Sequence, residues 1–369
     1  MSTITIPVHT SSRAYDVLVG PGVLDQVGEV CARCAGGTVA AVISDSNVAP
    51  LYGQRVLSSL ERAGYRTALL TFPAGEQNKR LSTLETLLEG LAAAELSRDD
   101  VVVALGGGVT GDMAGLAAAL YLRGIQVVQV PTSLLAMVDS SVGGKTAVDL
   151  AHGKNLAGAF HQPSAVVVDI DCLKTLSHEL FSDSCGEVIK HGVLADPALF
   201  AHLAKHPLNA PDVTSDELVS VVARNIEIKR NVVDADEKEH GLRQTLNLGH
   251  TLGHAIEASS NFTLGHGSSV AAGLCCIARG AAAKGWCSED CARQIERATL
   301  AHGLPIDTSV GHETIFAFAT HDKKRHGSTI NVVIPHAIGS VSVRTITFDE
   351  LAELIELGCN AHPSSEVSL

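Results

Sequence analysis

The first half of the chain alternates short β-branched runs with stretches of helical spacing, and this alternation restricts the fold more than any other feature. The runs lie at residues 39–43, 67–72, 101–105, 125–130 and 165–170. Helical spacing fills the intervals between them, for example at 51–63 and 81–94. Strands that alternate with helices form parallel βαβ units, in which helices cover the sheet. The sequence therefore predicts an α/β fold for this half.

The periodicity changes near residue 176. A 3.6-residue period runs through 179–204, 215–233, 244–258, 268–285, 288–302 and 348–357, and strand character returns at 329–334 and 339–347. We therefore expect an α/β domain at 1–176 and a mostly helical domain at 177–369, with the chemistry in the cleft between them. The first 20 residues alternate apolar and polar side chains, which predicts a strand or hairpin and not a signal peptide.

Charge and cysteine content exclude several classes of partner. The chain has 369 residues, with 40 acidic against 27 basic side chains and a net charge of −13, which disfavours nucleic acid and anionic membranes. No apolar run approaches the 18 residues of a membrane span. The nine cysteines form no regular framework, which suits a reducing compartment and predicts a cytoplasmic protein.

A glycine turn joins the run at 101–105 to an apolar stretch at 113–122. Residues 106–111 read Gly-Gly-Gly-Val-Thr-Gly and match the pattern GxGxxG. Glycines let the backbone approach a pyrophosphate, and a helix N-terminus offers unpaired N–H groups. The turn therefore indicates a Rossmann-like nucleotide-binding domain, although it follows a middle strand instead of the first one. The alternative is a tight packing turn that binds nothing.

The acidic residue that usually ends the next strand of a dinucleotide-binding unit is missing, because the run at 125–130 leads into Pro131-Thr132-Ser133. Two other carboxylates could hold a ribose or an adenine. Asp45 follows the first α/β strand, and Glu76 lies in the turn at 73–76. Taken singly, both are also typical helix caps.

Four side chains in the second half have the chemistry of a metal centre. His250 and His254 share one face of a helix, as in zinc peptidases, but Thr251 stands where a peptidase carries its glutamate base. His266 and Glu187 would allow a site of two imidazoles and one carboxylate, with a position open for substrate. The spacing leaves open which three of the four side chains bind the metal, and each histidine taken alone is more typical of a structural role.

Cationic and amide side chains accompany these motifs. They are Lys145, Lys154, Asn155, Lys190, Lys229, Arg243 and Asn247. Taken singly, each cation is typical of a solvated surface. In a chain of net charge −13, however, their concentration around the motifs favours a polyanionic substrate.

Long stretches of the chain resemble the 3-dehydroquinate synthases of the shikimate pathway. They are PAGEQNK at 73–79, GGGVTGDMAG at 106–115, RG at 123–124, VPTSLLAMVDSSVGGKTAVD at 130–149, GKNLAGAFHQP at 153–163, GEVIKHG at 186–192, DEKEHGLRQTLNLGHTLGHAIE at 236–257 and HDKK at 321–324. The resemblance covers nearly the whole chain.

The resemblance implies zinc on Glu187, His250 and His266, a donor set that also suits Co²⁺. It implies NAD contacts at Asp45, Glu76, Lys79, Gly107, Gly108, Val109, Asp112, Thr132, Ser133, Lys154 and Thr175. It implies substrate contacts at Asp139, Lys145, Asn155, Lys190, Lys229, Arg243, Asn247, His254 and one lysine of the Lys323-Lys324 pair, taken as Lys324. Arg123 resembles the arginine that reaches the substrate phosphate from a neighbouring subunit, so a homodimer is expected.

The resemblance also implies a reaction. The family converts 3-deoxy-D-arabino-heptulosonate 7-phosphate to 3-dehydroquinate and phosphate, for the biosynthesis of chorismate and the aromatic amino acids. NAD transiently oxidises the C5 alcohol, phosphate leaves by β-elimination, the hydride returns, and an intramolecular aldol reaction closes the ring. Arg243, Lys324 and Asn247 would grip the substrate carboxylate, which related sugar phosphate cyclases do not meet.

One departure from the family pattern concerns the metal. Ser268 stands where the family usually has a glutamate, so we expect the site to lack a carboxylate that would support a metal ligand. Ser133 replaces a more usual threonine. Two other functions fit the residues less well: a metal-dependent polyol or glycerol-phosphate dehydrogenase, which would release NADH, and a non-enzymatic NAD-sensing module, in which the cations have no role.

Overall fold

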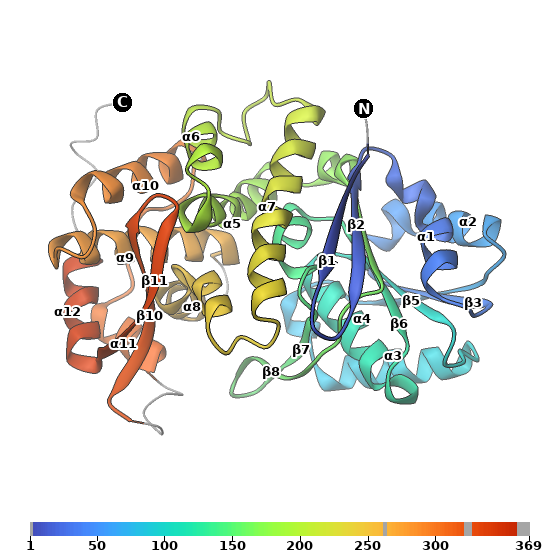
Figure 1. The fold of residues 1–369 in the computed structure, drawn as a ribbon. Coiled ribbons are helices and arrows are strands. Elements are labelled where there is room, and N and C mark those ends of the chain that lie inside the picture. The colour runs from blue at the N-terminus through green and yellow to red at the C-terminus, as the bar shows by residue number, and fades with distance from the viewer. Residues whose placement is uncertain (1–2, 261–263, 321–326, 360–369) are drawn as a thin grey trace. The chain divides into compact units, whose positions relative to one another are not determined.

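The structure is a computed structural model that describes residues 3–260, 264–320 and 327–359 (Figure 1). The chain divides into two units. Unit 1 comprises Met1–Leu176 and Thr214–Lys238, and unit 2 comprises Ser177–Val213 and Glu239–Leu369.

Unit 1 contains a seven-stranded sheet. Its strands lie in the order β1 (Ile4–His9), β2 (Ala14–Gly20), β9 (Ala165–Asp169), β6 (Gln126–Pro131), β5 (Val101–Gly106), β3 (Val39–Asp45) and β4 (Arg66–Phe72). The β1–β2 pair is antiparallel and every other pair is parallel. The predicted α/β fold and its N-terminal hairpin are confirmed.

Helices of unit 1 bury this sheet. α1 (Val27–Cys34) contacts β9, α2 (Gln54–Arg62) and α3 (Leu81–Ala93) contact β4, and α4 (Gly108–Leu120) contacts β5 and β6. All residues of β5 and β9 are buried, as are those of β3 before Asp45. Continuous burial is typical of parallel strands covered on both faces, and it explains the unbroken apolar runs in the sequence.

Two features of unit 1 differ from the prediction. A hairpin of β7 (Lys145–Leu150) and β8 (Gly153–Phe160) was not expected, because GKNLAGAF contains no β-branched residue. In addition, α7 (Ser215–Ala235) belongs to unit 1, whereas the predicted helical domain spans 177–369. Its helical period was recognised, but period alone does not show that this helix packs on β1 and β2.

Glu237 ties the end of the α7 segment to the β1–β2 turn. Its carboxylate accepts hydrogen bonds from the Ser11 and Ser12 hydroxyls, from the Ser12 amide (3.0 Å) and from Gln162 Nε2 (2.9 Å). Burial alone would raise the pKa of Glu237, but these hydrogen bonds lower it to about 2. The carboxylate therefore stabilises the fold above its unfolded pKa near 4.5, and this contribution is lost as pH falls towards 2.

We expect Glu237→Gln to lower the free energy of unfolding by about 2–3 kcal/mol at pH 7, because an amide replaces an ionised acceptor of several hydrogen bonds. The difference from the parent should shrink between pH 5 and pH 2, measured by urea unfolding at each pH. Glu289→Gln, in an exposed pair with Arg293, is the control and should change little. An equal loss at pH 7 and pH 3 would contradict this account of Glu237.

Unit 2 is mainly helical. Its helices are α5 (His178–Ala195), α6 (Pro197–Lys205), α8 (His250–Ser259), α9 (His266–Ala283), α10 (Glu289–Ala301), α11 (His312–Thr320) and α12 (Phe348–Gly358). A two-stranded sheet pairs β10 (Thr329–Ala337) with β11 (Ser340–Thr347). α9 packs against α5, α8, α10 and α12, so it forms the core of the unit.

Two helices predicted as continuous are interrupted. The period at 179–204 is divided between α5 and α6, because Pro197 cannot continue a helix and Asp196 caps α6 through the Ala198 and Leu199 amides (both 3.0 Å). The period at 244–258 is divided into a short turn, η7 (Leu242–Asn247), and α8, because Gly249 has a left-handed φ of 79°. This break determines where His250 begins its helix.

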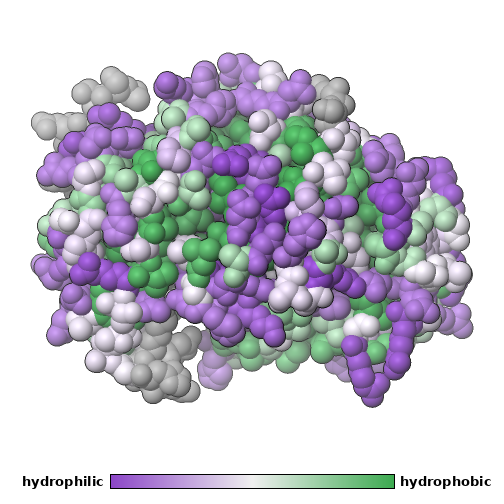
Figure 2. Space-filling view, in the orientation of Figure 1, coloured by the Kyte–Doolittle hydropathy of each residue, from purple (hydrophilic) through white to green (hydrophobic). Residues whose placement is uncertain are grey.

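The exposed surface and the cysteines have the properties expected from the sequence. Hydrophilic side chains cover much of the face shown in Figure 2, with hydrophobic patches between them. Among residues 3–260, 264–320 and 327–359, no helix combines the length and apolar character needed to cross a membrane. All nine cysteines are free thiols.

Candidate functional site

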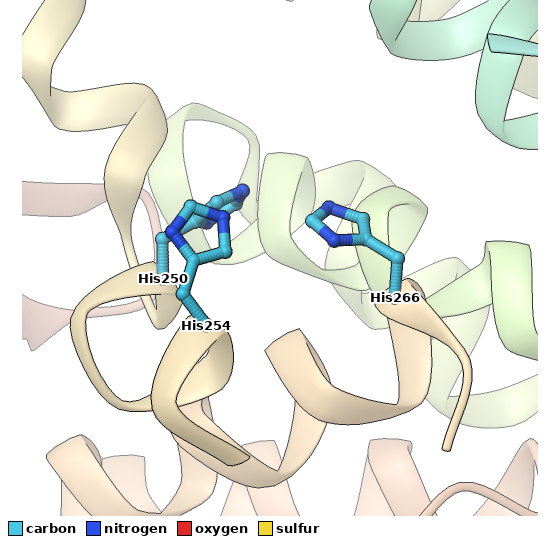
Figure 3. A group of neighbouring side chains, drawn as sticks. All are labelled: His250, His254 and His266. Carbon is cyan, nitrogen blue, oxygen red and sulfur yellow. The ribbon is translucent and has the colours of Figure 1, made fainter. Parts of the chain in front are cut away.

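Three helices of unit 2 bring four candidate metal ligands together. Glu187 comes from α5, His250 and His254 from α8, and His266 is the first residue of α9. Figure 3 shows the three imidazoles facing one another, with ring centroids 5.0 Å apart for His250–His254, 5.5 Å for His250–His266 and 5.8 Å for His254–His266. Each imidazole offers a nitrogen within 4.8 Å of the others.

Glu187 approaches two of these imidazoles equally. Its Oε1 lies 3.4 Å from His250 Nε2 and 3.4 Å from His266 Nε2. Zinc bonds of about 2.0–2.1 Å in a tetrahedral site place neighbouring ligand atoms about 3.4 Å apart. The other ring nitrogens point to acceptors: His250 Nδ1 lies 3.1 Å from the Leu248 carbonyl, and His266 Nδ1 lies 3.2 Å from Glu257 Oε2. In the neutral tautomers with the proton on Nδ1, both Nε2 lone pairs can bind a cation.

A close contact between α5 and α9 brings Glu187 near His266. A Cβ atom on Gly186 would lie 2.1 Å from the Gly267 carbonyl oxygen, so the two backbones touch. Asp183 of α5 also caps α9, accepting from the Ser268 amide (2.8 Å) and the Gly267 amide (3.2 Å). The small residues beside both ligands are therefore needed for the approach.

The site has a carboxylate beside a metal candidate, contrary to the expectation drawn from Ser268. Glu257, on α8, lies 3.2 Å from His266 Nδ1 and belongs to the stretch 236–257 that resembles the family. The sequence contained a signal for it, because His250, His254 and Glu257 follow the i, i+4, i+7 spacing of one helix face.

Burial and neighbouring charges determine the protonation of these ligands. Burial opposes ionisation of Glu187, but the adjacent Lys190 ammonium, with which it forms an ion pair, holds its pKa well below the usual value. Burial lowers the pKa of His250 to about 3, so its imidazole is neutral. Burial would also lower the pKa of His266, but hydrogen bonds to Glu187 and Glu257 raise it to about 10. The two carboxylates therefore stabilise positive charge on the His266 ring.

The other candidates of unit 2 surround these ligands in sequence. Lys190 is buried one turn after Glu187, and Arg243 is 2% exposed in η7. Asn247, also in η7, donates from Nδ2 to Glu239 Oε1 (3.0 Å). Lys323 and Lys324 lie outside the described residues.

In unit 1 the glycine turn connects β5 directly to α4, as predicted. β5 ends at Gly106 and α4 starts at Gly108, with Gly107 as its N-cap and no side-chain cap among the described residues. A Cβ on Gly106 would lie 2.4 Å from Thr110 Oγ1, so the tight turn requires glycine there. The first turn of α4 therefore presents backbone amides to an anion.

Asp45 lies beside this turn. Its Oδ2 accepts from Thr110 Oγ1 (3.0 Å), and its Oδ1 accepts from the Asn47 and Val48 amides (2.8 and 3.1 Å). Asp45 thus closes the turn after β3 and places a carboxylate next to the glycine turn, whereas the helical segment at 49–53 has no side-chain cap from it.

A buried lysine holds the next group of candidates together. Lys79 Nζ lies 2.6 Å from Asp112 Oδ2 and 2.5 Å from Asn155 Oδ1, and Lys154 Nζ lies 3.3 Å from Glu76 Oε1. Burial raises the pKa of Asp112, and the Lys79 ammonium opposes this shift. The structure therefore brings five residues from three separate motifs together through two ion pairs and a hydrogen bond.

Other candidates of unit 1 form hydrogen bonds with neighbouring segments. Lys229 of α7 donates to Asp139 Oδ1 (2.7 Å), and the Thr175 and Tyr52 hydroxyls are 2.6 Å apart. The Thr132 amide donates to the Gly106 carbonyl (2.9 Å), and Ser133 Oγ accepts from the Ala136 amide (3.3 Å).

Three further candidates are placed by the backbone. Val109 lies in the first turn of α4 and Lys145 begins β7. Arg123 has a left-handed φ of 70° directly after Leu122 at 49°. Tyr52 was missed, because nothing in its sequence context indicated that it would reach Thr175.

Family models that match this chain, and two similar proteins, are described as 3-dehydroquinate synthases. The sequence models for the 3-dehydroquinate synthase N-terminal and C-terminal regions match residues 69–183 and 184–325. A 3-dehydroquinate synthase of Caulobacter vibrioides is 44% identical over 348 residues, covering 92% of this chain and 94% of that protein. One of Symbiobacterium thermophilum is 44% identical over 353 residues, covering 94% and 97%.

Two solved structures have the same fold over almost their whole length. A 2-deoxy-scyllo-inosose synthase, complexed with carbaglucose-6-phosphate, NAD⁺ and Co²⁺, has a TM-score of 0.87 at 25% identity and covers 96% of this chain and 100% of its own. A 2-epi-5-epi-valiolone synthase from Streptomyces hygroscopicus, with NAD⁺ and Zn²⁺ bound, has a TM-score of 0.84 at 26% identity, covering 93% and 96%.

Proposed function

The chain belongs to the 3-dehydroquinate synthase family, and we propose that it carries out that family's reaction with NAD bound by unit 1 and a divalent metal ion bound by unit 2. The reaction converts 3-deoxy-D-arabino-heptulosonate 7-phosphate to 3-dehydroquinate and phosphate. The observation that carries the proposal is the convergence of His250 Nε2 and His266 Nε2 on Glu187 Oε1 at 3.4 Å each.

The residues present suit both a divalent metal ion and NAD. Glu187, His250 and His266 would hold the metal, with zinc as the ion that two imidazoles and one carboxylate suit, although Co²⁺ has the same preferences. The uncapped turn at Gly107 and Gly108 would hold the NAD pyrophosphate. When bound, NAD supplies a reversible hydride transfer and the metal makes the substrate alcohol more acidic.

The further NAD contacts extend from this turn. Asp45 would accept from a ribose hydroxyl, and Thr175 would approach the same cofactor. The Lys79–Asp112 and Lys154–Glu76 ion pairs would fix the surrounding backbone. The remaining proposed contacts are Val109, Thr132 and Ser133.

The cations of the chain would bind the two anionic ends of the substrate. Arg243, with Asn247 and Lys324, would hold the carboxylate, because a guanidinium fits a carboxylate through two parallel hydrogen bonds. Lys145, Lys190, Lys229 and Asn155 would stabilise the negative charge that grows on the departing phosphate, and Asp139 and His254 would contact the sugar hydroxyls. The contact of Lys229 Nζ with Asp139 Oδ1 (2.7 Å) would orient the lysine before substrate binds.

A homodimer in the cytoplasm completes the proposal. Arg123 follows a pair of exposed leucines, Leu120 (52% exposed) and Leu122 (39%), and β8 exposes Leu156 (50%) and Phe160 (47%). Large exposed apolar side chains favour an interface, and Arg123 would reach the partner's substrate phosphate from it. The free thiols fit a reducing compartment.

The function is tested by the products. Purified protein given the heptulosonate phosphate and NAD should release inorganic phosphate without net accumulation of NADH at 340 nm. Treatment with a chelator followed by desalting should lower the rate by at least about 100-fold, since a metal supplies several kcal/mol of transition-state stabilisation. Added Zn²⁺ or Co²⁺ should restore it. NADH accumulation with a polyol, without phosphate release, would identify a dehydrogenase instead.

A further inference from the structure

We infer that Glu257 is the positioning residue that orients His266 for metal binding, an inference that rests on the proposed metal centre. Glu257 lies on the same face of α8 as His250 and His254. Its side chain is 6% exposed, and its Oε2 lies 3.2 Å from His266 Nδ1. A buried carboxylate is costly unless it is paired, so this contact has a physical reason to persist.

The two imidazole ligands differ in how firmly their surroundings hold them. The His250 side chain is 13% exposed, and its Nδ1 lies 3.1 Å from the Leu248 carbonyl oxygen of its own chain segment. The His266 side chain is 32% exposed at the first residue of α9. Because packing confines His266 less, the hydrogen bond to Glu257 has a larger share in fixing the orientation of its ring.

Glu257 also selects the tautomer of His266. A carboxylate oxygen accepts a hydrogen bond from Nδ1–H, so the neutral imidazole carries its hydrogen on that atom. Its Nε2 lone pair is then left for a cation shared with Glu187 Oε1, which lies 3.4 Å from Nε2. Carboxylate acceptors of this kind raise ligand basicity, and their loss typically costs 10–100-fold in metal affinity.

Asp183 supports the same ligand differently. It caps the backbone amides of Gly267 and Ser268, and so it holds the start of α9 instead of the imidazole. Ser268, where the family usually has a glutamate, thus has its amide in the Asp183 cap. In this chain, therefore, the carboxylate that contacts the His266 ring comes from α8.

The test is a zinc titration of metal-free protein in competition with a chromophoric chelator. We expect Glu257→Ala to weaken zinc binding by up to about 100-fold and Glu257→Gln by about 10-fold, since the amide oxygen can still accept from Nδ1 without its charge. The matched control is Glu296→Gln, which removes a partly buried carboxylate of unit 2 (18% exposed), paired with Arg279 at 2.7 Å and contacting none of the four metal candidates in the contacts described. It should leave zinc affinity within about 2-fold.

A second measurement separates orientation from stability. The visible spectrum of the Co²⁺-loaded protein depends on ligand geometry, so both Glu257 variants should shift its bands while Glu296→Gln does not. Unchanged affinity and an unchanged Co²⁺ spectrum in either folded variant would overturn the role of Glu257. If Glu257→Ala does not fold, the volume-matched Glu257→Gln decides alone. Failure of the parent protein to bind zinc would instead refute the proposed metal centre itself.

Discussion

Replacing Glu187 by Gln should remove stoichiometric zinc and lower turnover by at least about 1000-fold. The substitution keeps the volume of the side chain but withdraws the one anionic ligand, whose oxygen lies 3.4 Å from both Nε2 atoms. It also leaves the buried Lys190 ammonium without its carboxylate partner. The variant therefore loses metal affinity and also carries a buried charge that is no longer neutralised by Glu187. Metal content after gel filtration and phosphate release from the substrate are the two measurements.

This variant also separates the two sets of three ligands that the geometry allows. If His250, His254 and His266 form the site, Glu187→Gln keeps its metal and His254→Ala loses it. If the proposed set is right, His254→Ala retains zinc and loses activity through the substrate alone. The exposed Glu289→Gln, with unaltered metal content and rate, controls for the loss of a negative charge.

The second large effect is expected from Arg243→Ala, which should lower kcat/KM by about 100- to 10,000-fold. A guanidinium that is 2% exposed binds a carboxylate where water competes weakly, and truncating one partner of such a pair costs about 3–5 kcal/mol. Arg243→Lys should recover only part of the loss, because an ammonium cannot match both carboxylate oxygens.

Steady-state kinetics of phosphate release, together with a binding assay for NAD, test this prediction. NAD affinity should stay within about 2-fold of the parent, since Arg243 lies in unit 2 and the proposed NAD contacts lie in unit 1. Thermal unfolding of each variant shows whether a lost rate comes from a lost fold. Kinetics like those of the parent would refute the assignment of Arg243 to the carboxylate.

Local pattern was sufficient for most elements of the fold. The apolar runs that became β3, β5 and β9 are continuous because these strands are buried, and the GxGxxG turn lies directly between β5 and α4. The errors came from single residues that override a period, such as Pro197 and the left-handed Gly249. The β7–β8 hairpin was not predicted because the residues of β8 have low strand propensity, and β8 is a strand through its pairing with β7.

The candidate site was less accessible to the same reasoning. Spacing placed His250 and His254 on one helix face, but it left the choice of ligands open, because that choice depends on how α5 and α9 meet. The contacts of Glu187 with His266 and of Lys79 with Asp112 join segments far apart in the sequence. Such pairs are close in space although they are distant in the sequence, so only the structure reveals them.

The backbone contact between Gly186 and Gly267 limits how this centre can be redesigned. Since α5 and α9 already touch there, the helices cannot move closer to compensate for a shorter ligand such as Asp at position 187. A larger side chain at Gly186 or Gly267 would push the two helices apart. Attempts to change which ion the proposed site prefers must therefore alter the donor atoms, because the distance between α5 and α9 cannot be shortened.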